Sequence, residues 1–291
     1  PAGAHDVPHG GHERRAPRRG LIHPLLDTSD IEFKEVKPFR HKLEQLRARL
    51  IKEKKVTTMA VYFRDLDNGL AFGLDQQTPF QPASLLKLPE LMAFLKKHEN
   101  DPSLLARRVP LNPGKPGELI PTFPPSSTLV AGQEYAIDEL LKAMIARSDN
   151  DALNTLLAAL SEPDYLRVYE DLGLRIPNVR DIEDPVTVRE YATFLRILYN
   201  ASYLTKDLSQ KALEYLAQSE FDKGIKGGVP PALTVAHKFG ESGRHDSPMR
   251  QLHDCGIVYH PEKPYVLCVM TRGTDMMKML PAIKETSALV Y

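Results

Sequence analysis

A serine and a lysine three residues apart, Ser84 and Lys87, are the first side chains in this 291-residue chain that could do chemistry together. They stand at the start of an apolar helical pattern over residues 85–97, and residues three apart share a helix face. The hydroxyl would lie at a helix N-terminus, which favours negative charge, with an amine beside it. A lysine kept partly neutral can take the proton of such a hydroxyl. Taken alone, a capping serine followed by a surface lysine explains the pair better.

Two further strings follow in the chain. Ser148-Asp149-Asn150 falls between two predicted helices, in a turn where short polar residues cap helix ends. Lys238-Phe239-Gly240 ends an alternating strand, and its glycine permits close approach of a substrate backbone. Each string alone has a structural explanation, but the three in this order favour one catalytic constellation, in which Lys238 is the second cation beside Lys87.

The three strings resemble the S-x-x-K, S-D-N and K-T-G motifs of the class A β-lactamase and penicillin-binding serine hydrolases. The resemblance runs from about Phe39 to the C-terminus, and residues 80–87 match best. It implies that a β-lactam or an acyl-D-Ala-D-Ala peptide of a peptidoglycan stem acylates the first serine. It also implies a set of catalytic residues, Ser84, Lys87, Ser148 and Lys238, and a set of substrate-binding residues, Asn150, Gly240, Glu241 and Ser242.

The resemblance also implies a role for each position. Lys87 would be the general base, Ser148 would relay a proton to the leaving nitrogen, Asn150 would hold the substrate amide and Asp149 would hold the turn. The oxyanion hole would consist of the backbone N–H groups of Ser84 and Glu241. No metal ion or organic cofactor is implied.

The chain departs from the family pattern at two places. Phe239 stands where the family has a hydroxyl that touches the substrate carboxylate, and Ser242, Arg244 or Arg250 could replace that contact. The E-x-x-L-N segment, whose glutamate activates the deacylating water, is absent. Asp181 or Glu183 could supply the missing base, but acids just before a helix are also typical caps.

The missing glutamate bears on which activity is expected. It favours peptidoglycan peptidase or esterase activity over efficient β-lactam hydrolysis, and it predicts slow deacylation. A sensor or binding module that acylates without useful turnover is the alternative from another class. A structural protein with accidental matches would form no adduct at all.

The elements around these strings predict an α/β (α+β) fold. A helix over residues 39–51 precedes strands at 56–64 and 70–74, which are joined around the turn signal Asp67-Asn68-Gly69. Six helical patterns fill residues 85–217, and strands at 233–239, 255–260 and 265–271 precede a helix from about residue 277. The pattern predicts a five-stranded antiparallel sheet flanked by the terminal helices, with an inserted, mostly α subdomain.

The predicted boundaries follow from this pattern. Residues 1–36 form a disordered or extended segment, and residues 37–291 form the hydrolase domain. Within it, residues 37–80 and 225–291 build the α/β layer, and residues 81–224 build the helical subdomain. Six prolines within residues 107–135 predict an extended loop without regular structure beside the cleft.

Composition limits the partners. Lys and Arg total 38, as do Asp and Glu, so no global field favours nucleic acid or an anionic membrane. No apolar run is long enough to span a bilayer. Cys255 and Cys268 are expected to be buried small hydrophobes without a disulfide. A monomer is expected, and the family resemblance implies a secreted, periplasmic or envelope-facing protein whose signal or anchor is not in this chain.

Overall fold

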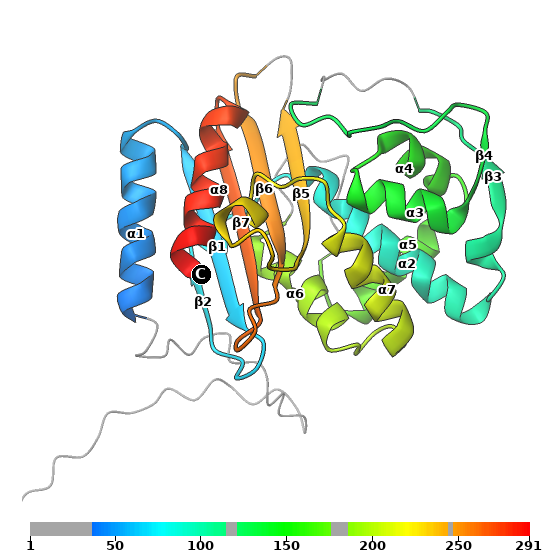
Figure 1. Cartoon of the computed structure of the whole chain (residues 1–291), viewed down its shortest axis with the longest axis horizontal. Helices are drawn as coiled ribbons and strands as arrows, with labels where there is room; N and C mark the ends of the chain where they lie inside the picture. Colours follow the sequence, from blue (N-terminus) through cyan, green and yellow to red (C-terminus); the bar gives the residue numbers. More distant parts are fainter. Residues whose placement is uncertain (1–36, 115–120, 176–185, 244–246) are drawn as a thin grey trace, which may run out of the picture.

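The computed structural model of the chain describes residues 37–114, 121–175, 186–243 and 247–291. A five-stranded antiparallel sheet of order β2-β1-β7-β6-β5 lies at its centre (Figure 1). The strands are β1 (Thr58–Asp65), β2 (Ala71–Leu74), β5 (Val235–Gly243), β6 (Arg250–Val258) and β7 (Tyr265–Gly273). The predicted sheet, with two strands from the start of the chain and three from the end, is therefore confirmed.

One face of the sheet is covered by the two terminal helices, α1 (Lys37–Lys52) and α8 (Met276–Val290) (Figure 1). Alternation along β1 shows how the sequence produces this layer, because side chains of a strand point to opposite faces in turn. Met59 and Val61 pack with the core beneath α1 and α8, whereas Ala60 and Tyr62 pack with the core on the other face.

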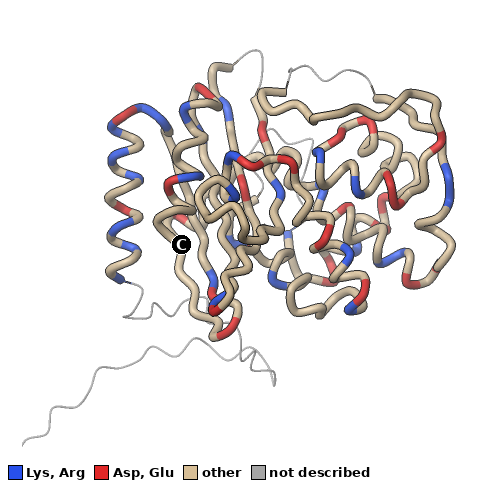
Figure 2. Tube along the Cα trace, viewed as in Figure 1, with Lys and Arg blue, Asp and Glu red and all other residues tan. Residues whose placement is uncertain are grey.

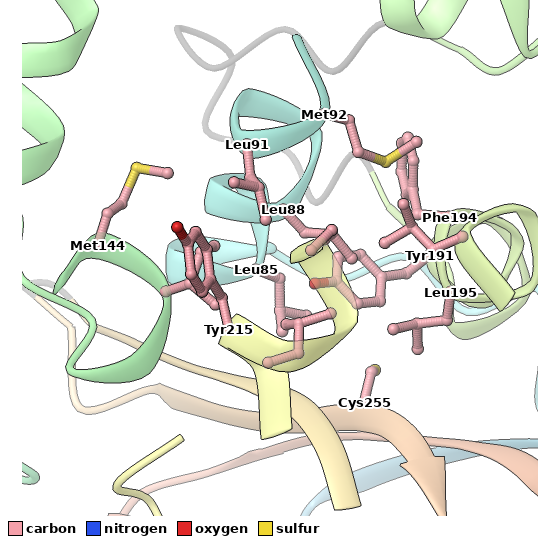
Figure 3. Close-up of a cluster of buried hydrophobic side chains, with 14 of the residues drawn as sticks. Leu85, Leu88, Leu91, Met92, Met144, Tyr191, Phe194, Leu195, Tyr215 and Cys255 are labelled. Carbon is pink, nitrogen blue, oxygen red and sulfur yellow. The ribbon is translucent and has the colours of Figure 1, made fainter. Parts of the chain in front are cut away.

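The other face carries the helical part of the chain. Its helices are α2 (Lys87–Asn100), α3 (Ile137–Ala146), α4 (Asn150–Leu157), α5 (Glu162–Asp171), α6 (Val188–Tyr199) and α7 (Lys206–Ala217). Figure 3 shows the packing between α2 and α6, where Leu88 and Met92 lie near Tyr191 and Phe194. This buried cluster fixes α2, the helix that follows Ser84, against the rest of the fold.

The proline-rich segment is more regular than its composition predicts. Two short strands, β3 (Arg108–Pro110) and β4 (Glu134–Ala136), pair in an antiparallel ladder, so the expectation of no regular structure in this segment was wrong. Pro110 lies at the end of β3, where a strand tolerates a residue without a backbone donor.

The two cysteines also differ from the expectation. Cys255 on β6 and Cys268 on β7 are direct partners in the strand register, and the structure joins them in a disulfide. The prediction of two free, buried thiols was therefore wrong. The disulfide forms because the register of two neighbouring strands brings together two cysteines that lie 13 positions apart in the sequence.

Both signs of charge occur throughout the described part of the molecule, with Lys and Arg more frequent along α1 (Figure 2). Figure 2 shows Lys and Arg interspersed with Asp and Glu along both the sheet and the helices, in keeping with the equal totals. In the described ranges, none of the helices combines the length and the apolar character needed to cross a membrane.

Candidate active site

Ser84 lies in a short 3₁₀ turn, Ala83–Leu86, that continues directly into α2. A side chain of the sheet binds the residues just before this turn. The backbone carbonyl of Gln81 accepts a hydrogen bond of 2.8 Å from Nε2 of His253 on β6. The Nδ1 of the same ring accepts from the backbone N–H of Thr271 at 3.3 Å, which sets the tautomer. His253 thus holds Gln81, three residues before Ser84, against β6.

Gly240 on β5 lies against this same turn. A Cβ atom at Gly240 would stand 2.8 Å from the carbonyl oxygen of Pro82 and 3.2 Å from the amide nitrogen of Leu85. A side chain at Gly240 would therefore collide with the backbone of the turn Ala83–Leu86 that contains Ser84.

Ser148 occupies the turn between α3 and α4 with a left-handed backbone, φ 56°. Asp149 begins α4 as its N-cap, and its carboxylate accepts a hydrogen bond of 2.8 Å from the backbone N–H of Ala152. This contact is the one expected of an aspartate that holds the turn. It leaves the side chain of Ser148 directed at the two lysines.

Both lysines bind the hydroxyl of Ser148. Lys238 Nζ donates to Ser148 Oγ at 2.9 Å, and Lys87 Nζ lies 3.2 Å from the same oxygen. Lys87 also donates to the carbonyl oxygen of Ser148 at 2.6 Å and to Oδ1 of Asn150 at 2.7 Å. The structure therefore brings Lys87, Ser148, Asn150 and Lys238 together, and Lys238 lies within β5 and not at its end.

Burial controls the charge of both amines, since Lys87 is 1% exposed and Lys238 is fully buried. Desolvation lowers the pKa of Lys87 to about 8, against the opposing effect of Glu90 and Asp149. Desolvation lowers the pKa of Lys238 well below its ordinary value, and repulsion from Lys87 adds to the effect. A neutral amine is therefore accessible near physiological pH.

The backbone carbonyl of Ser84 accepts a hydrogen bond from the backbone N–H of Lys87, but within the described ranges its hydroxyl makes no hydrogen bond to Lys87 or to another residue. The amine of Lys87 is directed at the Ser148 turn instead of the serine one helical turn before it. Active-site hydrogen bonds of a free enzyme are often completed only when a substrate binds.

Ser84 opens into a cavity of about 300 Å³, which we call the Ser84–Phe239 cavity. Ser148, Asn150 and Glu241 also line it. The carboxylate of Glu241 accepts hydrogen bonds from the backbone N–H groups of Thr122 at 2.9 Å and Phe123 at 3.2 Å. The segment that we expected to border a cleft is thereby tied to the edge strand β5, and it forms one wall of this cavity.

Phe239 gives the same cavity an aromatic wall. Its ring stacks on Phe221 at 4.2 Å between centroids and meets Phe123 edge-on at 6.3 Å. Of the residues that could replace the missing hydroxyl, Ser242 and Arg250 line the cavity. The hydroxyl of Ser242 donates to Oε1 of Gln81 at 3.2 Å. Arg244 lies outside the described residues.

Glu90 is an acidic residue of this region that the sequence interpretation missed. It lies on α2, three residues after Lys87, and it lines a second cavity together with Ser84, Lys87 and Asn150. We call this the Ser84–Glu90 cavity. The sequence does contain a signal for it, because Glu90 is an acid within the apolar pattern of residues 85–97 and continues the three-residue spacing of Ser84 and Lys87. Asp181 and Glu183, the two predicted substitutes for the missing base, lie outside the described residues.

Comparison with known proteins gives the family. The family model of the Beta-lactamase enzyme family matches residues 42–291. A curated β-lactamase of Streptomyces lavendulae is 25% identical over 267 residues, or 85% of each chain. The solved structure of PBP-A has a TM-score of 0.70 at 21% identity, covering 86% of this chain and 94% of its own. The solved ancestral class A β-lactamase has a TM-score of 0.71 at 24% identity, covering 85% and 98%.

The matched residues 42–291 include the whole sheet, the helical part and all three motifs. The chain belongs to the β-lactamase enzyme family.

Proposed function

We propose that the chain is a serine hydrolase that forms an acyl-enzyme through Ser84, on β-lactams or on peptides that resemble D-Ala-D-Ala. One observation carries the proposal. The hydroxyl of Ser148 is within hydrogen-bonding distance of both Lys87 and Lys238, at the cavity into which Ser84 opens. Acyl transfer needs a nucleophile, a base that can be neutral, and a hydroxyl that relays a proton.

In the proposed acylation, the neutral amine of Lys87 takes the proton of Ser84 Oγ, directly or through one water. The Oγ atom attacks the carbonyl carbon, and the backbone N–H groups of Ser84 and Glu241 stabilise the oxyanion. The bond from carbon to the leaving nitrogen then breaks. Ser148 gives that nitrogen its proton and recovers one from the lysines that bind it. Asn150 holds the amide of the substrate.

Deacylation is proposed to be slow, because the sequence lacks the glutamate segment of the efficient hydrolases. The same absence favours a second candidate function, a penicillin-binding sensor that acylates without useful turnover. A variant of the similar protein PBP-A has been solved as an acyl-enzyme complex with penicillin G. Action at the cell envelope as a monomer belongs to the proposal, since peptidoglycan peptides lie there.

Mass spectrometry after incubation with penicillin G tests the proposal. We expect the full chain to gain the mass of one penicillin on the peptide that contains Ser84, and Ser84→Ala to gain none. The thermal transition of Ser84→Ala should move little, because a half-buried cleft hydroxyl contributes little to the core. If Phe239 makes the reaction with penicillin weak, an activated ester that acylates serine is used as the probe instead. Undiminished labelling of the variant contradicts the proposal.

A further inference from the structure

Glu90 is a buried acidic residue with an unpaired carboxyl oxygen in the part of the chain that the structure describes. It is 8% exposed, and its Oε2 atom is inaccessible to solvent and accepts no hydrogen bond from the residues that the structure describes. Leaving such a group unpaired costs folding free energy, about 1 to 3 kcal/mol or more for a charged group. A buried polar atom of this kind therefore calls for a functional explanation.

Two structural explanations account for little of this burial. Glu90 lies in the first turn of α2, where the helix dipole favours a negative charge, but an exposed position would gain the same benefit. An ion pair with Lys87 is the other explanation. The amine of Lys87 instead donates to Ser148 and Asn150, and the described residues include no contact within 4.0 Å between its nitrogen and Glu90.

Glu90 and Ser84 line one cavity, although Glu90 comes six positions later in the chain. Ser84 lies in the 3₁₀ turn Ala83–Leu86, which continues directly into α2, and Glu90 lies in the first turn of α2. Helical side chains lean toward the N-terminus, so the side chain of Glu90 leans toward the turn that contains Lys87. The Ser84–Glu90 cavity has a volume of about 450 Å³, which is large enough to hold water.

The charged and titratable neighbours decide when Glu90 can accept a proton. Burial raises its pKa to about 8, and Lys87 on the same helix partly opposes that shift. From α5, the facing groups are Tyr165 and Tyr169, whose hydroxyls bond to each other at 2.9 Å and whose pKa values burial raises. Glu241 faces the cavity from β5. A carboxylate with such a pKa can both take and return a proton near neutral pH.

We propose that Glu90 is the general base that activates the water of deacylation. The inference rests on the proposed acyl-enzyme at Ser84. The carboxylate takes one proton from a water in the Ser84–Glu90 cavity while the water oxygen bonds to the ester carbonyl carbon. The bond between that carbon and Ser84 Oγ then breaks, and Oγ receives the proton from Glu90. One water is consumed, and the products are a carboxylic acid and the free serine.

The decay of the acyl-enzyme tests this role separately from its formation. The full chain and Glu90→Gln are labelled with penicillin G, freed of excess reagent, and followed by intact mass. At pH 9, above the pKa of Lys87, we expect the two to label at rates within about threefold, and the adduct of Glu90→Gln to decay at least about 100-fold more slowly. Glu99→Gln makes the same change on the same helix, outside the cavity, and should decay like the parent.

Hydroxylamine supplies a second measurement, because it attacks an ester without a protein base. It should release the adduct from Glu90→Gln as fast as from the parent chain, which shows that the site is folded and open. In the parent, decay should accelerate as pH rises through about 8, and Glu90→Gln should lose this acceleration. Equal decay of Glu90→Gln and the parent overturns the role of Glu90. An adduct absent from the parent with both penicillin and an activated ester overturns the proposed function itself.

Discussion

Lys238 donates a hydrogen bond of 2.9 Å to the hydroxyl of Ser148, although 90 residues separate them in the chain. The contact joins the sheet to the helical part, because Lys238 lies on β5 and Ser148 lies in the turn between α3 and α4. Lys87 binds the same hydroxyl, so two buried amines share one acceptor oxygen. Such an arrangement favours the loss of one proton from the pair of lysines.

The first prediction concerns the pH dependence of acylation. Because burial lowers the pKa of Lys87 to about 8, its neutral form appears as pH rises through that value, and the rate of penicillin labelling should rise with it. Lys87→Met should collapse labelling, and Lys87→Arg should not restore it, because a guanidinium keeps its proton. The second-order labelling rate, measured from pH 6 to pH 9, checks this, and a flat profile would assign Lys87 no part in proton transfer.

Glu90 offers a control for that profile. Its charge raises the pKa of Lys87, so Glu90→Gln should move the rising limb of the acylation rate to lower pH. If the rise in acylation rate occurred at the same pH in Glu90→Gln and in the parent, Glu90 and Lys87 would titrate independently.

The second prediction concerns stability and is independent of activity. The pKa of Glu90 is about 8 in the fold against an ordinary value of 4.5, so the folded chain binds more protons than the unfolded chain between these values. The stabilisation from protonated Glu90 is complete below about pH 4.5 and is lost as pH rises through 8. The melting temperature of Glu90→Gln relative to the parent should therefore increase by several degrees between pH 5 and pH 8.5. A constant difference would contradict the burial of this carboxylate.

Much of the fold could be predicted from local patterns. The apolar run over residues 265–271 predicts β7, and the Asp67-Asn68-Gly69 turn predicts the pairing of β1 with β2. In that turn, the side chain of Asp65 accepts hydrogen bonds from the backbone N–H groups of Asp67 and Asn68. These features depend on neighbours in sequence, where periodicity and turn chemistry are informative.

The rest depends on contacts between distant segments. The disulfide follows from the register of β6 against β7, which no single strand reveals. The ladder of β3 and β4 joins segments on either side of a proline-rich stretch. The burial of Glu90 depends on how α5 packs against α2. None of the three motifs reveals that the amine of Lys87 donates to Ser148 and not to Ser84.

The third prediction concerns Phe239. Its ring stands where the family has a hydroxyl for the substrate carboxylate, and it stacks on Phe221 in the wall of the Ser84–Phe239 cavity. Phe239→Thr should raise the labelling rate for penicillin, which carries a carboxylate, by about tenfold, the value of one added hydrogen bond of about 1.4 kcal/mol. The variant should also melt at lower temperature, because aromatic packing is lost.

An uncharged activated ester separates recognition from reactivity in this experiment. Phe239→Thr should not increase the acylation rate with that ester, because the ester has no carboxylate to bind. An equal gain with both reagents would show that Phe239 limits access to Ser84 and not carboxylate recognition.

The last prediction concerns turnover, where the sequence departs furthest from its family. A positioned base contributes about 10² to 10⁴ in rate, and the E-x-x-L-N glutamate that supplies it elsewhere is absent here. Stopped-flow kinetics with a chromogenic cephalosporin should show a burst of about one equivalent, followed by a slow steady state. Glu90 then sets the slow phase, and Glu90→Gln should keep the burst while lowering the steady rate. Rapid multiple turnover without a burst would contradict slow deacylation. If Asp181→Asn or Glu183→Gln then abolished that rapid turnover, the substituted residue would be identified as the base in place of Glu90. The amplitude of the burst reports acylation and the later slope reports deacylation, so one trace for each variant distinguishes a hydrolase from a penicillin-binding sensor.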